Sequence, residues 1–469
     1  MSIPTAQELV VPSGFVARSL DVFPDLLELQ RAKPKRYPHL LESAAAGTPH
    51  ARYDILFAFP RCRLWLTGDQ RLMRDDQCVG VGDFLEALDR EWCEHARPAH
   101  PLTSWQDMLP FTGGWFVYLG YELVTQIEAK LKYAPTVSDM LTASLTRIPA
   151  AIIRDHQAHM THLVCESADA DQLIPQMERD LQSCTRHYDH TLAPVRVAEE
   201  DPEVFLAGVE RILAYIRAGD VFQVNLSRPW HAWLDEPMNA ARLYECLRAA
   251  NPAPFAGLMT LDPDTAIVSS SPERLVRVSG RHIYTRPIAG TYPRSGDRLQ
   301  DLRWSEELLR HPKERAEHVM LIDLERNDLG RVCRAGSVEV NELMVLESYR
   351  HVHHIVSEVT GVLREDITPA QIIRAVFPGG TITGCPKVRC MEIIAELEQA
   401  PRGPYTGSMG YLNRDGSMDL NILIRTMVLQ GDHVQLRAGA GIVADSRPMR
   451  ELRETRAKAK GLLAALGCA

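Results

Sequence analysis

The sequence predicts an α+β fold, built from antiparallel strands with helices between them. Short apolar runs separated by Gly, Pro and Asp fill the first part of the chain, for example at residues 53–59, 113–120 and 150–154. The second part combines further strand patterns with apolar runs of helical spacing. Because most of these strands are spaced for hairpins, the mixture favours α+β over a Rossmann arrangement.

One helix is marked at both of its ends. Asp201 can cap it, Pro202 fits its first turn and Gly219 can end it. The apolar residues on one face of this helix are Phe205, Val209, Ile212, Leu213 and Ile216. Further strands are expected at residues 221–227, 265–269, 281–285, 409–412, 420–429 and 434–438, and further helices at residues 301–310, 314–327, 388–398 and 449–466.

The chain is expected to divide into two domains. Residues 1–185 form the predicted N-terminal domain, and residues 202–469 form the second. Between them, residues 186–201 are predicted to be a linker because their apolar periodicity fades.

Composition excludes several classes of protein. The net charge is −9 and no basic stripe stands out, which argues against nucleic acid as a partner. Ten cysteines are scattered without C-x-x-C pairs, so neither a zinc site nor a disulfide framework is indicated. No signal peptide and no 18-residue apolar run are present, so we expect a cytoplasmic protein without a membrane partner.

The most informative stretch is residues 377–394, Phe-Pro-Gly-Gly-Thr-Ile-Thr-Gly-Cys-Pro-Lys-Val-Arg-Cys-Met-Glu-Ile-Ile. Its three glycines allow the backbone to approach a ligand, and Pro386 suits the first position of a helix. Unpaired N–H groups at that helix end, together with Lys387, would form an anion site. The alternative is an ordinary glycine turn that caps a helix.

The order of residues in this stretch does not fit a nucleotide P-loop, because Gly380 and Gly384 are followed by Cys-Pro-Lys. A small carboxylate or phosphate ligand is therefore the better hypothesis. Cys385 and Cys390 could be nucleophiles, but neither has an obvious paired base nearby, and small apolar filler is the other interpretation.

Two predicted helices each carry a pair of carboxylates one turn apart. Glu314 and Glu317 form one pair, and Glu451 and Glu454 form the other. If the two helices face each other, their oxygens would suit Mg²⁺. Each pair could instead lie on a solvated helix face.

Two further features could belong to a binding site. His353 and His354 are adjacent, so at most one is expected to face a site and move protons; otherwise both are polar packing or surface residues. Arg425 interrupts an apolar strand pattern, and its guanidinium needs either a ligand carboxylate or a structural ion pair. The glycines at 439 and 441 offer a second loop that a ligand can approach.

Several motifs occur in order between Gly219 and Lys458. They are Gly-Asp-Val-Phe-Gln-Val-Asn-Leu-Ser-Arg from residue 219, Arg-Pro-Ile-Ala-Gly-Thr from residue 286, Asp-Leu-Glu-Arg-Asn-Asp-Leu-Gly-Arg from residue 323, the stretch at 377–394, and Ala-Gly-Ala-Gly-Ile-Val-Ala-Asp-Ser from residue 438. With these motifs the chain resembles the chorismate-utilising enzymes, a family that includes anthranilate synthase component I, aminodeoxychorismate synthase component I, and the isochorismate and salicylate synthases. The N-terminal part matches more loosely, through Leu-Leu-Glu-Ser at 40–43 and residues 113–121.

The resemblance implies a two-lobed fold like that of anthranilate synthase component I, with packed antiparallel sheets, outer helices and an active-site cleft in the catalytic part, residues 202–469. It implies that Mg²⁺ is held by Glu314, Glu317, Glu451 and Glu454. It implies chorismate contacts at Arg425, Tyr405, Lys387, Thr383, Gly384, Gly439 and Gly441. The positions assigned to the reacting centre are His354, as acid or base, and Gln223, Ala289 and Thr381.

Gln223 helps to decide whether water or ammonia is the nucleophile. Relatives that add water carry a lysine base at this position, and glutamine cannot deprotonate water. Ammonia is therefore the expected nucleophile. No glutaminase motif is evident in the chain, so the ammonia is expected to come from a partner subunit, a glutamine amidotransferase.

The markers of the two aminating branches conflict. Asn225 and the sequence Gly-Gly-Thr-Ile-Thr-Gly at residues 379–384 resemble those of aminodeoxychorismate synthases. Ala289, however, stands where the well-known members of that branch carry a lysine that attacks the ring. We expect an aminodeoxychorismate synthase component I that lacks this lysine, a transferase that aminates chorismate for p-aminobenzoate and folate biosynthesis. The alternative is anthranilate synthase component I, which forms anthranilate and pyruvate for tryptophan biosynthesis.

Residues 40–43 resemble the segment that binds tryptophan in relatives. Leu41, Glu42 and Ser43 are therefore expected to line an effector-type site. In relatives this site is either a feedback site or a structural one.

Overall fold

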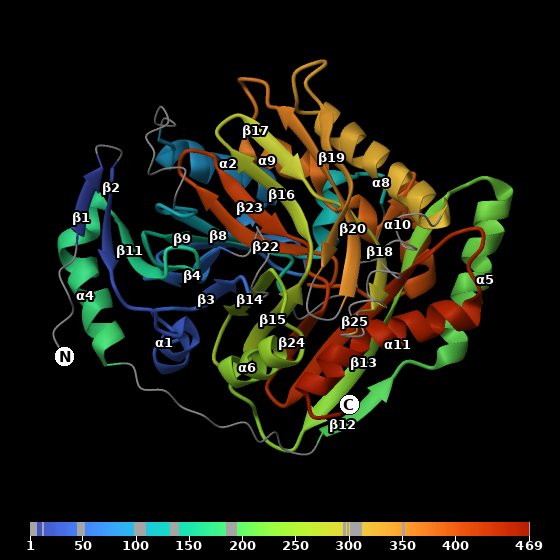
Figure 1. Cartoon of the computed structure of the whole chain (residues 1–469), viewed down its shortest axis with the longest axis horizontal. Helices are drawn as coiled ribbons and strands as arrows, with labels where there is room; N and C mark the ends of the chain where they lie inside the picture. Colours follow the sequence, from blue (N-terminus) through green and yellow to red (C-terminus); the bar gives the residue numbers. More distant parts are fainter. Residues whose placement is uncertain are drawn as a thin grey trace.

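The computed structural model describes residues 7–11, 14–44, 52–97, 109–131, 140–183, 195–293, 297, 300, 312–348 and 352–468. Within this part the chain forms two large sheets, and neighbouring strands in both are antiparallel (Figure 1). The α+β prediction is confirmed. The predicted helix at 301–310 lies outside the described residues.

The first sheet has 13 strands among the described residues. Along it lie β1 (Gln7–Val11), β2 (Phe15–Leu20), β11 (Met160–Glu166), β10 (Ala150–Asp155), β4 (Tyr53–Ala58), β3 (His39–Glu42), β14 (Phe255–Thr260), β15 (Thr265–Ser271), β24 (Thr426–Gln430), β25 (His433–Ile442), β13 (Gln223–Leu234) and β12 (Val195–Glu199). The short strand β21 (Gly384–Cys385) pairs with the start of β13. This pairing brings the predicted glycine loop to the edge of the sheet.

The second sheet has 12 strands among the described residues. Its order is β18 (Ile288–Pro293), β20 (Val352–Val362), β17 (His282–Thr285), β16 (Arg274–Ser279), β23 (Met418–Asn421), β22 (Ser408–Asn413), β8 (Gly114–Leu119), β9 (Ala143–Ile148), β5 (Arg63–Leu66), β6 (Arg71–Arg74) and β7 (Gln77–Val81), and β19 (Glu339–Ser348) pairs with β20. A buried apolar cluster that includes Phe57 of the first sheet and Phe116 and Met409 of the second packs between the two sheets. The sheets are therefore layers of one structure.

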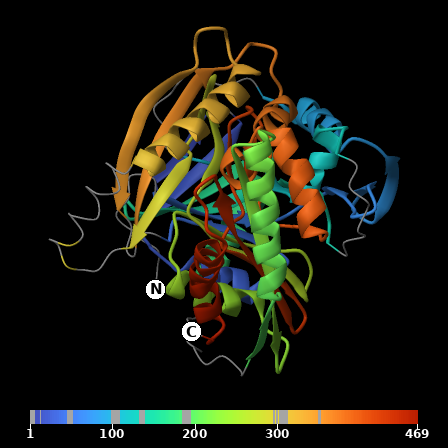
Figure 2. The same ribbon diagram turned by 90° about the vertical axis from the view of Figure 1, so that its right-hand side faces the viewer.

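Helices cover the outer faces of the sheets. They are α1 (Leu26–Ala32), α2 (Phe84–His95), α3 (Val124–Ile127), α4 (Ala170–Gln182), α5 (Pro202–Ala218), α6 (Ala240–Ala250), α8 (Pro312–Gly330), α9 (Pro369–Val376), α10 (Lys387–Glu398) and α11 (Pro448–Ala465). Figure 2 shows α5 beside α11, while α8 lies against the strands β18 and β20. None of the helices in the described part of the chain has both the length and the apolar character needed to cross a bilayer.

The predicted ends of α5 are confirmed. Asp201 is the N-cap, and its carboxylate accepts a hydrogen bond from the Glu203 amide at 3.0 Å. Gly219 ends the helix in the left-handed conformation, with φ of 81°. These local signals were sufficient because capping depends on residues next to one another in sequence.

One prediction of local structure is wrong. The predicted strand at 420–429 is broken, because the chain leaves the second sheet after β23 and enters the first sheet at β24. The end of the predicted linker is a strand, since β12 pairs with β13 at the sheet edge. Both sheets also combine strands from before and after residue 185, as β3 pairs with β14 and β8 pairs with β22.

Candidate active site

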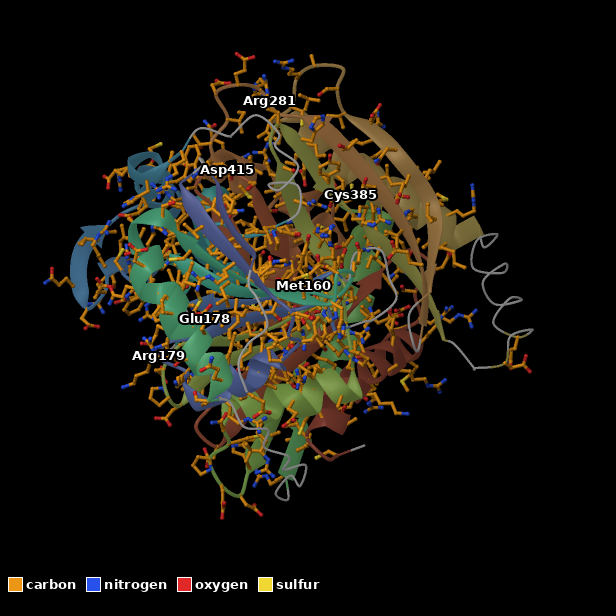
Figure 3. All side chains as sticks on the ribbon, turned by 60° about the vertical axis from the view of Figure 1, so that its left-hand side comes forward. Met160, Glu178, Arg179, Arg281, Cys385 and Asp415 are labelled. Carbon is orange, nitrogen blue, oxygen red and sulfur yellow. The ribbon has the colours of Figure 1, made fainter. Side chains whose placement is uncertain are left out.

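The glycine loop closes against the first sheet immediately before α10. Residues Gly380–Ile382 form one 3₁₀ turn, and Gly384 then pairs with Val224 of β13. Gly384 has φ of 129°, and a Cβ there would clash with the carbonyl oxygen of Gln223, so the position requires glycine. Pro386 is the N-cap of α10 and Lys387 is its first residue, one position away from the sequence prediction. Cys385, labelled in Figure 3, marks this junction, on the side of the molecule away from Glu178 and Arg179 of α4.

The hydroxyls of the loop have different environments. Thr383 is buried, and its Oγ1 donates a hydrogen bond to the Gly379 carbonyl at 2.8 Å. Its side chain therefore stabilises the loop itself. The Oγ1 of Thr381 is buried and faces the carboxyl group of Glu273, although the two do not form a hydrogen bond of ordinary geometry. Of the two hydroxyls, Thr381 is the one available to a ligand.

Lys387 is paired within the protein. Its ammonium group forms an ion pair with the carboxylate of Asp328 on α8. Burial raises the pKa of Asp328 although Lys387 opposes the rise. A ligand carboxylate would share Lys387 with Asp328, and the assignment of Lys387 to substrate binding stays a prediction.

Arg425 stands where the chain crosses from one sheet to the other, with φ of 54°. Within the described part of the chain its guanidinium makes no hydrogen bond and no ion pair, and burial lowers its pKa although Tyr405 and Glu454 oppose that change. The structural ion pair considered from the sequence is therefore not found there. A half-buried guanidinium without an ion pair to a described residue is suited to a carboxylate ligand.

Helix α11 brings Glu454 and Lys458 to the same place. The Lys458 ammonium donates to the Gly439 carbonyl at 3.0 Å and lies 2.7 Å from the Glu454 carboxylate. A Cβ at Gly439 would lie 2.7 Å from the Tyr405 hydroxyl and 2.8 Å from the Asn225 amide oxygen. Tyr405, Asn225 and Lys458 thus all lie against Gly439, and a side chain at this position would clash with Tyr405 and Asn225.

Strand β13 contributes two amide side chains to the site. Gln223 and Asn225 are both buried, and each side-chain oxygen lacks a hydrogen-bond partner in the part of the chain that the structure describes. The Gln223 amide nitrogen lies 2.7 Å from where a Cβ at Gly441 would stand. Buried acceptors without partners are costly, so these two oxygens are available to a hydrogen-bond donor such as a ligand N–H or O–H group.

Sequence reasoning missed Glu273. This carboxyl group is 5% exposed, and its Oε1 has no hydrogen-bond partner among described residues. Burial raises the pKa of Glu273 to about 7; the Thr381 side chain opposes the rise and the Glu325 carboxylate adds to it. Such a group can donate or accept a proton near neutral pH. In the sequence, Glu273 could have been noticed only as an acidic residue that follows the apolar strand pattern at 265–269.

Glu325 on α8 has a similar environment. Burial raises the pKa of its carboxyl group to about 7, and Asp328 adds to the rise while Lys387 opposes it. Glu325 Oε1 lies 3.4 Å from where a Cβ at Gly380 would stand. Two buried carboxyl groups, Glu273 and Glu325, therefore lie beside the glycine loop.

The predicted Mg²⁺ ligands are only partly described. Glu451 and Glu454 lie in α11, the former buried and the latter beside Lys458 and Arg425. Glu317 lies on α8, and the side chain of Glu314 is outside the description. Among the side chains described, no three acidic, His or Cys groups are close enough to hold a metal ion. The described carboxylates suit Mg²⁺ in their chemistry, and the four-residue site stays a prediction.

The side chains of His354 and Ala289 also lie outside the description. Their strands are neighbours, since Ala289 pairs with Ile355 and Thr291 pairs with His354 in the β18–β20 ladder. Burial raises the pKa of the thiols of Cys385 and Cys390. A neutral thiol is a poor nucleophile, which favours the interpretation of both cysteines as filler.

A separate cavity of about 380 Å³ is lined by Leu41, Glu42 and Ser43 from the predicted effector segment. Arg274, the residue after Glu273, also lines it and forms a two-point ion pair with Asp419 at 2.9 and 3.0 Å. The structure thus brings the predicted effector residues to one cavity, and the ligand of that cavity stays a prediction.

Comparisons with known proteins agree with these features. The family described as chorismate binding enzyme matches residues 41–464. Anthranilate synthase component 1 of Thermus thermophilus is 42% identical over 446 residues, 93% of this chain and 94% of that protein. Aminodeoxychorismate synthase component 1 of Bacillus subtilis is 41% identical over 458 residues, 93% of each protein.

A solved structure is also similar along most of its length. The crystal structure of anthranilate synthase component I from Streptococcus pneumoniae has a TM-score of 0.78 and 31% identity, and the match covers 89% of this chain and 93% of that one. Because the family match extends over most of the sequence, this chain belongs to the chorismate-binding enzymes and is an enzyme that acts on chorismate.

Proposed function

We propose that this chain is an aminodeoxychorismate synthase component I, which replaces the 4-hydroxyl of chorismate with an amino group from ammonia. The observation that carries this proposal is the buried amide of Gln223, whose side-chain oxygen has no partner among described residues. An amide can bind ammonia but cannot take a proton from water at neutral pH. The site is therefore suited to amination and not to hydration.

The proposed ligand position follows from the unpaired groups. Arg425 and the Tyr405 hydroxyl bind one carboxylate of chorismate, and the loop around Thr381 faces the ring. Burial raises the pKa of Tyr405 to about 12, so this hydroxyl stays protonated and can donate a hydrogen bond. Because Gly439 has no side chain, its backbone lies directly against the Tyr405 hydroxyl and the Asn225 amide, which border the proposed ligand position.

The proposed chemistry needs an acid at the leaving hydroxyl. His354 was assigned this task from the sequence, and Glu273 is proposed to share it because it lies beside Thr381 of the glycine loop and burial raises its pKa to about 7. Ammonia adds to the ring at C2 as the 4-hydroxyl takes a proton and leaves as water. A second ammonia then adds at C4 as the first amine leaves, so one hydroxyl is exchanged for one amino group overall. Ala289 offers no nucleophile, so no covalent link to the enzyme forms at that position.

The proposed metal ion would be bound by carboxylate side chains of the chain. Bound Mg²⁺, held by Glu314, Glu317, Glu451 and Glu454, would supply positive charge to a substrate carboxylate and so favour departure of the hydroxyl. Lys458 holds Glu454 in place and attracts Glu273 electrostatically. Lys458 therefore orients Glu454 and favours the ionised form of Glu273.

The ammonia is proposed to come from a glutamine amidotransferase subunit. Relatives named as component 1 support this arrangement. The purified chain should use ammonium salts directly and should use glutamine only after the second subunit is added. Turnover of glutamine by the isolated chain would contradict this part of the proposal.

Anthranilate synthase component I is the second candidate. It is favoured by the relative from Thermus thermophilus, at 42% identity, and by the absence of a lysine at Ala289. Incubation with chorismate, Mg²⁺ and ammonium separates the two. Anthranilate fluorescence without an added lyase would overturn the proposal, while p-aminobenzoate formed only after a lyase is added would support it.

A further inference from the structure

A second inference concerns Arg402, a residue that is buried behind the proposed chorismate site. This site, called the proposed cleft, is formed by Gln223, Asn225, Thr381, Tyr405 and Arg425. Its side chain is 1% exposed, so it is removed from solvent although it carries a permanent charge. It lies in the connection between α10 and β22. Buried arginines are retained when each of their N–H groups has a partner, so the partners of Arg402 identify its task.

All five N–H groups of Arg402 have acceptors. Nε and Nη2 donate to the two oxygens of Glu398 at 3.0 and 2.6 Å. Nη2 also donates to the Asn225 carbonyl at 2.8 Å. Nη1 donates to the Ile382 carbonyl at 3.1 Å and to Thr406 Oγ1 at 3.3 Å. One planar group thus fixes three separate segments of the chain, in a geometry that lysine cannot reproduce.

Each of these segments forms a wall of the proposed cleft. Asn225 lies on β13 two residues from Gln223, and Ile382 lies between the two threonines of the glycine loop. The guanidinium also lies over the ring of Tyr405, 5.6 Å from its centre. Arg402 therefore links β13, the glycine loop and Tyr405 through one side chain, in addition to the backbone pairing of β21 with β13.

Arg402 is itself held rigidly. The Glu398 carboxylate accepts hydrogen bonds from the amide and hydroxyl of Ser227 at 2.8 and 2.9 Å and from Arg437 at 2.8 Å. Burial would raise the pKa of Glu398, but Arg402 and Arg437 lower it below its usual value, so the carboxylate is ionised. The backbone amide of Arg402 donates to Glu122 at 2.7 Å. The network is satisfied on every side and is preorganised.

We propose that Arg402 is a positioning residue that sets the affinity of the cleft for chorismate by fixing β13, the glycine loop and Tyr405 relative to one another. The inference rests on the proposed function of the cleft. It does not require Arg402 to contact the substrate. Because the walls bind substrate and transition state alike, loss of their alignment should raise KM for chorismate more than it lowers kcat.

Arg147 provides a matched control elsewhere in the molecule. Its side chain is 6% exposed, and it bonds the Glu166 carboxylate at 2.5 Å and the carbonyls of Gly114 and Ile148 at 2.9 and 3.0 Å. It also lies over an aromatic ring, that of Trp115. Arg147 is therefore like Arg402 in its burial, in its carboxylate and carbonyl partners and in its aromatic neighbour. Its partners, however, are not residues of the proposed cleft.

The experiment compares Arg402→Lys with Arg147→Lys in the full chain. Both variants should lower the melting temperature by several degrees. Only Arg402→Lys should raise KM, and the chorismate Kd measured by calorimetry, by about tenfold or more while kcat changes by about threefold or less. Thr406→Val removes one acceptor of Arg402 with little change of shape, and should raise the same constants about twofold to threefold even if Arg402→Lys fails to fold.

Two results would overturn the inference. One is an unchanged KM and Kd in Arg402→Lys despite a lower melting temperature, and the other is an equal rise in Arg147→Lys. Turnover is followed as loss of chorismate, so the result does not depend on the product. If the wild-type protein forms anthranilate, the proposed function fails on its product while the Arg402 comparison still gives its answer.

Discussion

The proposed cleft and the cavity around Leu41 differ in how their polar groups are paired. In the cleft, Arg425 makes no ion pair with a described residue, and the buried oxygens of Gln223 and Glu273 lack hydrogen-bond partners there. In the cavity, Arg52 is 2.9 Å from Asp155, Arg274 is paired with Asp419, and Glu42 lies 3.1 Å from Arg248.

This difference separates two kinds of site within one molecule. Consecutive residues of one segment, Glu273 and Arg274, belong to the two environments. Groups left without partners in the folded chain are available to a substrate, and they are costly unless a ligand satisfies them. Groups already paired contribute to stability. Mutations should therefore affect activity in the first region and stability in the second.

The largest expected effect is at the predicted metal site. Glu454→Gln should abolish Mg²⁺-dependent loss of chorismate, by about a thousandfold, because the amide cannot replace a carboxylate ligand. Chelation of Mg²⁺ in the wild-type protein should have the same effect. Chorismate loss as a function of Mg²⁺ concentration checks both.

Glu454 also pairs with Lys458 on its own helix, so a control is needed. Asp323→Asn removes a comparable exposed pair, with Arg326 on α8, and should leave activity unchanged. Near-normal turnover in Glu454→Gln would refute its role as a ligand.

The next effect is at Glu273. Glu273→Gln should reduce kcat by about a hundredfold to ten-thousandfold, because the proton donor is lost. In the wild type the rate should fall as the pH rises through about 7, where this carboxyl group loses its proton. A pH profile of chorismate loss checks the result, and a variant with full activity and an unchanged basic limb would contradict it.

The same carboxyl group also affects stability. Its folded-state pKa of about 7 lies above its ordinary value of 4.5. The contribution of the protonated carboxyl group to the free energy of unfolding is therefore complete below pH 4.5 and is lost as the pH rises through 7. In Glu273→Gln this part of the pH dependence of unfolding should vanish.

Paired and unpaired arginines should respond differently. Arg425→Gln should lower kcat/KM by about a hundredfold, because a carboxylate of the substrate loses its partner, and should leave the free energy of unfolding unchanged or higher. Arg52→Gln should leave kcat/KM within about twofold but lower the free energy of unfolding by about 1–2 kcal/mol. Kinetics and chemical denaturation of both variants check this pair. The reverse pattern would show that pairing does not distinguish the two regions.

The smallest expected effect is ligand stabilisation at the second cavity. If residues 41–43 form a tryptophan site, added tryptophan at a hundred times its Kd should stabilise the protein by about 2–3 kcal/mol. The measurement is the melting temperature with tryptophan and with alanine as a control ligand. An equal response to both amino acids would contradict the assignment.

Local features of the fold were predictable from the sequence. The ends of α5 and the glycine at 384 follow from capping and close approach, which depend on near neighbours. The break in the strand pattern before Arg425 was not predictable, because an apolar run does not reveal that its two halves belong to different sheets.

The same limit applies to the site. Residue type identified Arg425 as a candidate, and the family resemblance identified Gln223. The pairing of Lys387 with Asp328 depends on residues 59 apart and left no signal in either segment. Glu273 was missed for a related reason. Its raised pKa comes from burial by the assembled fold, and burial is set by contacts that a sequence pattern does not contain.

The most direct test of the central claim is the structure of the product made with ¹⁵N-labelled ammonium. The purified chain is incubated with chorismate and Mg²⁺, and the product is examined by mass spectrometry before any lyase is added. The account predicts one labelled amino group in place of the 4-hydroxyl, with the enolpyruvyl side chain still attached. Labelled anthranilate, with the side chain released as pyruvate, would contradict it.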